Sequence, residues 1–93
     1  FRRVLFRSRC SSPKTGIVME VYTDQPGVQL YTGNWMSGNL RGKHDHRYPA
    51  RAALCLETQH YPDSPNKPEY PSTRLNPGET FRSTTIFRFT LEA

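Results

Sequence analysis

Apolar and polar residues alternate along much of the chain, and this pattern predicts short β-strands. Over residues 17–23 every second side chain is apolar, namely Ile17, Met19 and Val21. Alternation returns at residues 28–32, 51–58 and 81–91. Because successive side chains of a strand point to opposite faces, a period of two is typical of strands with one buried face. No stretch has the period of an amphipathic helix, so we predict a mostly β protein without a substantial helix.

The strand at residues 51–58 carries a carboxylate at the point where a proline-rich loop begins. Leu54 and Leu56 fall on one face, where we expect a core, whereas Cys55 and Glu57 fall on the other. A strand end beside a rigid loop holds a side chain in a fixed direction, which suits a catalytic carboxylate. The alternative is a solvated glutamate without a role in catalysis, because acidic side chains lie mostly at protein surfaces.

The strand at residues 28–32 places an amide and a phenol on one face. Gln29 and Tyr31 share this face, about 7 Å apart along the strand, whereas Val28 and Leu30 share the other. An amide donates and accepts hydrogen bonds, as recognition of sugar hydroxyls requires, and an aromatic ring covers an apolar sugar face. The alternative is an ordinary polar outer face.

The last strand, residues 81–91, has an aromatic side that we expect to pack on another layer: Phe81, Phe87, Phe89 and Leu91. The chain of 93 residues allows one domain at most. Only 34% of its residues are hydrophobic, which is low for a self-sufficient core. Four or five short strands would also leave open sheet edges. The chain therefore fits part of a larger sheet structure.

The net charge of +5 is concentrated at the N-terminus and does not indicate a nucleic-acid partner. Four of the thirteen basic residues lie within residues 1–9, where there is no acid, so nine basic residues face eight acidic ones elsewhere. A nearly neutral body does not track phosphates. We interpret residues 1–8 as a non-native or unassigned basic segment. The alternative is a strand centred on Val4, Leu5 and Phe6.

The sequence contains neither a membrane span nor a disulfide framework. No stretch approaches the roughly 18 apolar residues that a transmembrane helix needs, so we expect no membrane partner. Two cysteines do not form a framework. We expect Cys55 to be a small buried apolar residue, and a Cys10–Cys55 bridge is the alternative. Cys10–Gly16 reads as a polar turn.

Two loops invite functional interpretations that we set aside. His44-Asp45-His46 would need a third and fourth ligand to hold a metal, for which His60 and Asp63 are candidates. Their spacing fits no known local motif, so we predict a solvated loop, with Trp35 and Met36 tucked under it. Prolines recur at every third position from Pro62 to Pro71, as in a polyproline II docking peptide. We favour a rigid loop, tied by local hydrogen bonds of Asp63, Asn66 and Tyr70.

Three sequence blocks resemble the aldose 1-epimerase (galactose mutarotase) family, in the family's order and spacing. They are QPGVQLYTGN from residue 25, CLETQHYPDSPN from residue 55 and PSTRLNPGETF from residue 71. The resemblance implies an antiparallel β-sandwich, of which residues 9–93 would form the C-terminal quarter, and an isomerase that needs no cofactor or metal. It also matches Glu57 with the family's general base and Gln29 with a sugar-binding glutamine.

The resemblance implies interconversion of the α and β anomers of free hexoses such as galactose and glucose. The family's acid is a histidine from far upstream, so we expect this chain alone to be inactive and to require the rest of a mutarotase chain. His44, His46 and His60 do not fit that role. The alternative is a catalytically silent carbohydrate-binding β-sandwich. We expect a cytoplasmic location, with a secreted or periplasmic parent as the alternative.

Overall fold

A computed structural model of the chain describes residues 2–92. Five strands and two single 3-10 turns make up its regular structure, and no α-helix occurs within the described residues. The elements are β1 (Leu5–Ser11), β2 (Ile17–Thr23), β3 (Gly27–Tyr31), η1 (Lys43–Asp45), β4 (Cys55–Gln59), η2 (Ser64–Asn66) and β5 (Thr85–Leu91). The predicted all-β fold class is confirmed.

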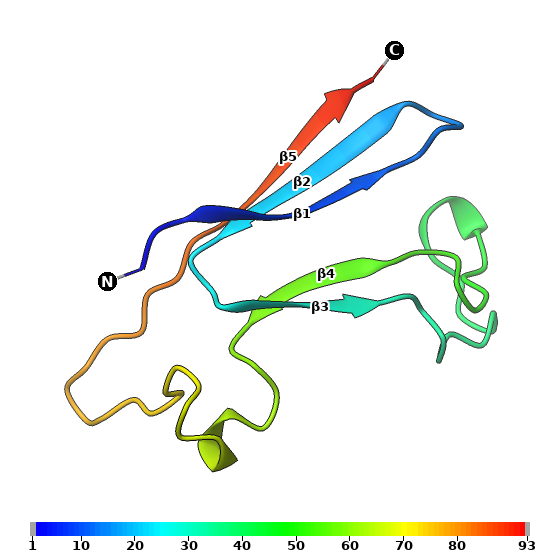
Figure 1. The fold of residues 1–93 in the computed structure, drawn as a ribbon. Coiled ribbons are helices and arrows are strands. Elements are labelled where there is room, and N and C mark those ends of the chain that lie inside the picture. The colour runs from blue at the N-terminus through cyan, green and yellow to red at the C-terminus, as the bar shows by residue number, and fades with distance from the viewer. Residues whose placement is uncertain (1, 93) are drawn as a thin grey trace.

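The strands form two antiparallel sheets that meet at one end and diverge at the other (Figure 1). The larger sheet has the order β1-β2-β5, with β2 in the centre, and the smaller sheet is the β3-β4 ribbon. The sheets approach each other near the β2–β3 connection and separate toward the β1–β2 turn (Figure 1). All strand pairs are antiparallel, as the family resemblance implies.

Strand β1 begins inside the basic N-terminal segment. Leu5 pairs with Thr23 and Cys10 pairs with Met19, with a β-bulge between Phe6 and Ser8. Residues 5–8 thus belong to a strand, and the interpretation of residues 1–8 as non-native stays a prediction. The structure also corrects the predicted polar turn, which begins only at Ser12, because the two residues before it still pair with β2.

Strands β4 and β5 begin four residues later than the pattern predicts, for two local reasons. Arg51 adopts a left-handed φ of 63°, and the amide of Ala52 donates to the carbonyl of Pro49, so the chain turns before β4. Before β5, the Asp24 carboxylate accepts hydrogen bonds from the Ser83 hydroxyl at 2.8 Å and the Thr84 amide at 3.2 Å. These polar contacts hold the chain where strand pairing was expected.

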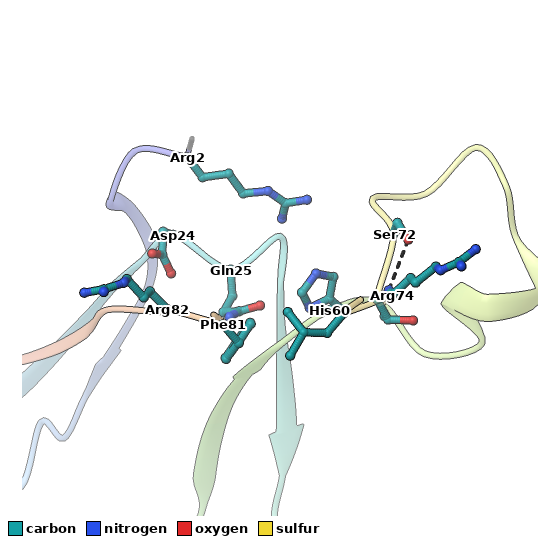
Figure 2. A pocket seen from close by; sticks show the side chains of 10 residues that line it. Arg2, Asp24, Gln25, His60, Ser72, Arg74, Phe81 and Arg82 are labelled. Carbon is teal, nitrogen blue, oxygen red and sulfur yellow. Dashed lines mark hydrogen bonds between the residues drawn. The ribbon is translucent and has the colours of Figure 1, made fainter. Parts of the chain in front are cut away.

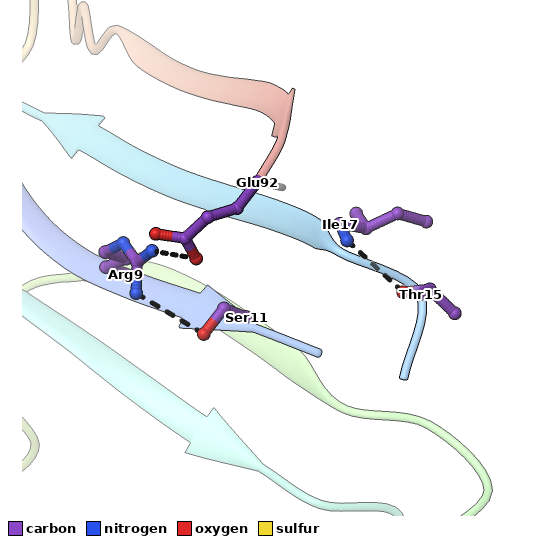
Figure 3. A network of polar contacts seen from close by, with 5 residues as sticks. All are labelled: Arg9, Ser11, Thr15, Ile17 and Glu92. Carbon is purple, nitrogen blue, oxygen red and sulfur yellow. Dashed lines mark hydrogen bonds and ion pairs between the residues drawn. The ribbon is translucent and has the colours of Figure 1, made fainter. Parts of the chain in front are cut away.

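Central strand β2 carries the small apolar core. Val21 is fully buried and Val18 is 3% exposed, on opposite faces of the sheet. On one face, Glu20 lies between Arg9 and Arg88 of the flanking strands. The Arg9 guanidinium also reaches past β2 to the Glu92 carboxylate at 2.8 Å (Figure 3).

The other face of the large sheet is apolar and largely uncovered within the described chain. Phe89 is 64% exposed and Leu91 is 80% exposed. Their predicted packing on a second layer is therefore not present here, because the β3-β4 ribbon covers only the Thr23 end of the sheet. Leu54 is also exposed, and the prediction of a buried Cys55 is wrong, because Cys55 shares the solvent-facing side of the ribbon with Glu57. Within residues 2–92 no layer covers Phe89 and Leu91.

The loops bear out one prediction and overturn another. In the proline loop, the Asn66 amide donates to the Asp63 carboxylate at 2.6 Å, and the rings of Tyr61 and Tyr70 lie 5.0 Å apart. A 3-10 turn at Ser64–Asn66 interrupts the proline repeat. The predicted local hydrogen bond between Asp63 and Asn66 is therefore confirmed, and the rigidity of the loop stays a prediction. By contrast, Trp35 is 90% exposed and does not tuck under its loop.

Candidate active site

The β3-β4 ribbon brings together the two residues that sequence analysis selects. Gln29 lies directly opposite Glu57 in the antiparallel register. Directly opposed residues point to the same face, with Cβ atoms about 4.5–5.5 Å apart. An amide and a carboxylate that are separated by a long loop in the sequence thus become immediate neighbours.

This ribbon face is open to solvent. Both Glu57 and Gln29 are exposed. Within residues 2–92 the Glu57 carboxylate has no hydrogen-bond or ion-pair partner, so its oxygens are free to accept a proton from a ligand. The Tyr31 hydroxyl shares the face but accepts a hydrogen bond from the Trp35 amide at 3.3 Å, which turns it toward the loop.

The opposite ribbon face is anchored on the large sheet. Thr58, the residue after Glu57, contacts the Thr85 hydroxyl of β5 at 2.8 Å. Thr85 in turn contacts the fully buried Thr23 of β2 at 3.0 Å. Because neighbouring side chains on a strand point to opposite faces, Glu57 points away from the sheet that holds its strand. Pattern analysis did not select these threonines, since only the tertiary fold brings them together.

A polar cavity of about 380 Å³ lies beyond the end of this ribbon (Figure 2). Its lining includes His60, Gln25, Asp24 and three arginines, but neither Glu57 nor Gln29. The Gln25 side-chain nitrogen donates to the Ser83 hydroxyl at 2.8 Å, whereas its buried side-chain oxygen has no partner among residues 2–92. No local sequence motif marks this cavity, because its walls come from well-separated segments.

The hydrogen bond from the Ser83 hydroxyl lowers the pKa of Asp24, and the Thr84 amide lowers it further. Asp24 is therefore a stable anion beside the cavity and a weak proton acceptor near neutral pH. Its geometry ties the β2–β3 connection to the segment before β5. We interpret it as a structural carboxylate, in contrast to the unpartnered Glu57.

His44 and His46 are not arranged to bind one metal ion. Their rings are 6.3 Å apart, and Asp45 between them forms an ion pair with Arg41 at 2.8 Å. Across residues 2–92, no group of three or more His, Cys, Asp or Glu side chains could hold a metal ion. In the same part of the chain, no helix is long and apolar enough to cross a membrane.

Comparison with known proteins gives a consistent family match. The aldose 1-epimerase family model matches residues 8–88. Galactose mutarotases of Mus musculus and Homo sapiens are 49% and 48% identical over 86 residues, which make up 92% of this chain and 25% of each relative. The aldose 1-epimerase of Escherichia coli is 40% identical over 77 residues, which cover 80% of this chain and 22% of that protein. The chain spans about a quarter of the length of these relatives.

Proposed function

Because the chain belongs to the aldose 1-epimerase family, we propose that it takes part in interconverting the α and β anomers of free hexoses such as galactose and glucose. In this proposal Glu57 is the general base and Gln29 binds the sugar. The ribbon register supports it, because it sets an amide that can hold a hydroxyl directly beside a carboxylate that can deprotonate one.

The proposed reaction moves two protons. Glu57 takes the proton of the sugar's C1 hydroxyl while an acid protonates the ring oxygen, so the C1–O5 bond breaks and an open aldehyde forms. Rotation about the C1–C2 bond turns the other carbonyl face toward the C5 hydroxyl. Ring closure then reverses both transfers: the C5 oxygen bonds to C1, the deprotonated acid takes the C5 hydroxyl proton, and Glu57 returns its proton to the former carbonyl oxygen on C1. Atoms and charges balance without a cofactor.

We propose that the acid, a histidine, comes from outside this chain, in a polypeptide of the relatives' length. The open face around Glu57 fits this division, because the ribbon supplies only one side of a sugar site. A base separated from its acid loses the advantage of positioning both groups together. We therefore expect the 93-residue chain alone to show little or no mutarotase activity. Free cysteines also fit the proposed cytoplasmic location.

The test protein is a polypeptide of the relatives' length that carries this chain. Grafting the chain into mouse galactose mutarotase, in place of the matching segment, provides such a protein. Its activity is followed by optical rotation of freshly dissolved α-D-galactose. We expect rotation to equilibrate faster than the spontaneous rate, and Glu57→Gln to lose at least about a hundredfold of this acceleration while sugar binding remains nearly intact.

Glu57→Asp is the matched control, because it keeps the carboxylate and withdraws it by one methylene. It should retain more activity than Glu57→Gln. Near-normal turnover of Glu57→Gln would contradict the assignment of the base. Spontaneous-rate equilibration by the unmutated test protein, with galactose still bound, would instead favour a catalytically silent sugar-binding sandwich.

A further inference from the structure

Three threonine hydroxyls connect β4 to two strands of the large sheet, β5 and β2. Thr58 Oγ1 lies 2.8 Å from Thr85 Oγ1, which lies 3.0 Å from Thr23 Oγ1. Thr23 is fully buried, and its hydroxyl also lies 3.1 Å from the carbonyl of Thr84. The three hydroxyls form a continuous chain from the back of the ribbon into the sheet.

Donor counting fixes the direction of this chain. Each hydroxyl has one proton to donate and two lone pairs to accept. A carbonyl only accepts, so the Thr23 hydroxyl donates to the carbonyl of Thr84. The lone pairs of the Thr23 hydroxyl then accept the backbone amide of Gln25 at 3.1 Å and the hydroxyl of Thr85. Thr85 has thus spent its proton on Thr23, so Thr58 must donate to Thr85. All protons run from the ribbon toward the sheet.

We infer that the Thr58–Thr85–Thr23 hydroxyl chain positions Glu57 for proton transfer. Glu57 and Thr58 are consecutive residues on opposite faces of β4, so a shift of Thr58 toward or away from the sheet moves the Glu57 carboxylate with it. The hydroxyl chain has one donor direction and joins the ribbon to two strands of the large sheet, and these contacts restrict the shift of Thr58. Thr85 is the central member and acts as a positioning residue.

This inference rests on the proposed role of Glu57, and its test separates the two. In the test protein, Thr85→Val removes the hydroxyl at nearly constant volume, whereas Thr85→Ser retains it. We expect Thr85→Val to lower kcat about tenfold or more, since a displacement of about 1 Å costs up to about a hundredfold. The KM for galactose should change less than kcat, and Thr85→Ser should restore most of the activity.

Val18→Ala is the stability control, because Val18 is buried on the opposite sheet face and contacts none of the three hydroxyls. Unfolding midpoints in urea place the variants on one stability scale. Positioning is supported if Thr85→Val loses kcat while Val18→Ala, destabilised equally or more, does not. Unchanged kcat in Thr85→Val, with Glu57→Gln inactive, overturns the inference alone. Proportional losses in both variants, or no rescue by serine, also overturn it. An active Glu57→Gln would refute the proposed base itself.

Discussion

The turn between β1 and β2 offers a stability prediction whose terms can be separated. Gly16 adopts a φ of +76°, and its carbonyl accepts the Glu92 amide at 2.7 Å, which ties this turn to the end of β5. A Cβ at this position would lie 2.7 Å from the Glu92 carbonyl oxygen. Both atoms of that contact belong to or adjoin backbone, so a side-chain rotation cannot relieve it. Gly16→Ala should therefore separate the turn from β5.

The expected cost has two parts. An alanine in the left-handed region costs about 1–2 kcal/mol. Displacement of the Glu92 backbone breaks the hydrogen bond to Gly16, which contributes about 0.5–1.5 kcal/mol. The free energy of unfolding should therefore fall by about 1.5–3.5 kcal/mol in Gly16→Ala.

Gly78 provides the matched control for the conformational part. Its φ is +84°, but no atom of the described part of the chain lies within 4 Å of the Cβ that alanine would add. Gly78→Ala should cost only the left-handed term, about 1–2 kcal/mol.

Urea unfolding of the test protein, followed by circular dichroism, gives both differences from the midpoint and slope. Hydrogen exchange at the Glu92 amide reports the broken contact directly, and it should accelerate only in Gly16→Ala. Equal destabilisation by the two substitutions, with Glu92 exchange unchanged, would show that the contact with the end of β5 carries no stability.

Two further predictions concern charged groups away from the ribbon. The hydrogen bond from Ser83 lowers the pKa of Asp24 in the folded state. The contribution of this carboxylate to stability is therefore complete above its unfolded pKa of about 4, and it is lost as pH falls through the lower folded value. Asp24→Asn should flatten the acid limb of an unfolding curve measured against pH, and a limb of unchanged slope would exclude this carboxylate as its source. The Arg9–Glu92 ion pair is largely exposed, so Glu92→Gln should cost at most about 1 kcal/mol at low salt and nothing measurable in 1 M NaCl. A cost that persists in high salt would contradict a screened surface pair.

The bounds of a strand can be predicted from the sequence where its hydrophobic pattern alone determines them. β2 was predicted to the residue, because its alternation is complete and it pairs on both sides. The starts of β4 and β5 were predicted four residues early, because hydrophobic pattern does not register a left-handed Arg51 or a carboxylate such as Asp24 that captures backbone amides. Pattern describes the faces of a strand better than its ends.

Burial was the least predictable property, and Cys55 shows the reason. Its alternation with Leu54 and Leu56 defines two faces, but the face that is covered depends on which layer the rest of the fold supplies. The candidate site had the same limit. Sequence reasoning raised Glu57 and Gln29 singly, from strand pattern and then from a family resemblance. Their direct opposition depends on a strand register that a long loop leaves open. The threonine chain depends on contacts between two sheets and had no sequence signal.

The proposal that this chain works within a longer polypeptide accounts for two open surfaces, the apolar faces between the two sheets and the ribbon face that carries Gln29 and Glu57. Each surface would have a separate role. Leu30 and Leu56 share the ribbon face that carries Thr58, and this face turns toward the sheet face that carries Thr85 and Phe89. The sheets diverge beyond the threonine contact (Figure 1), so further chain that packs between them would bury apolar residues of both. Gln29 and Glu57 point to the opposite side of the ribbon and would stay open to sugar. Added chain would thus pack against the ribbon face that carries Thr58, where the threonine hydroxyls hold the ribbon to the sheet. The face that carries Glu57 would remain accessible for the reaction.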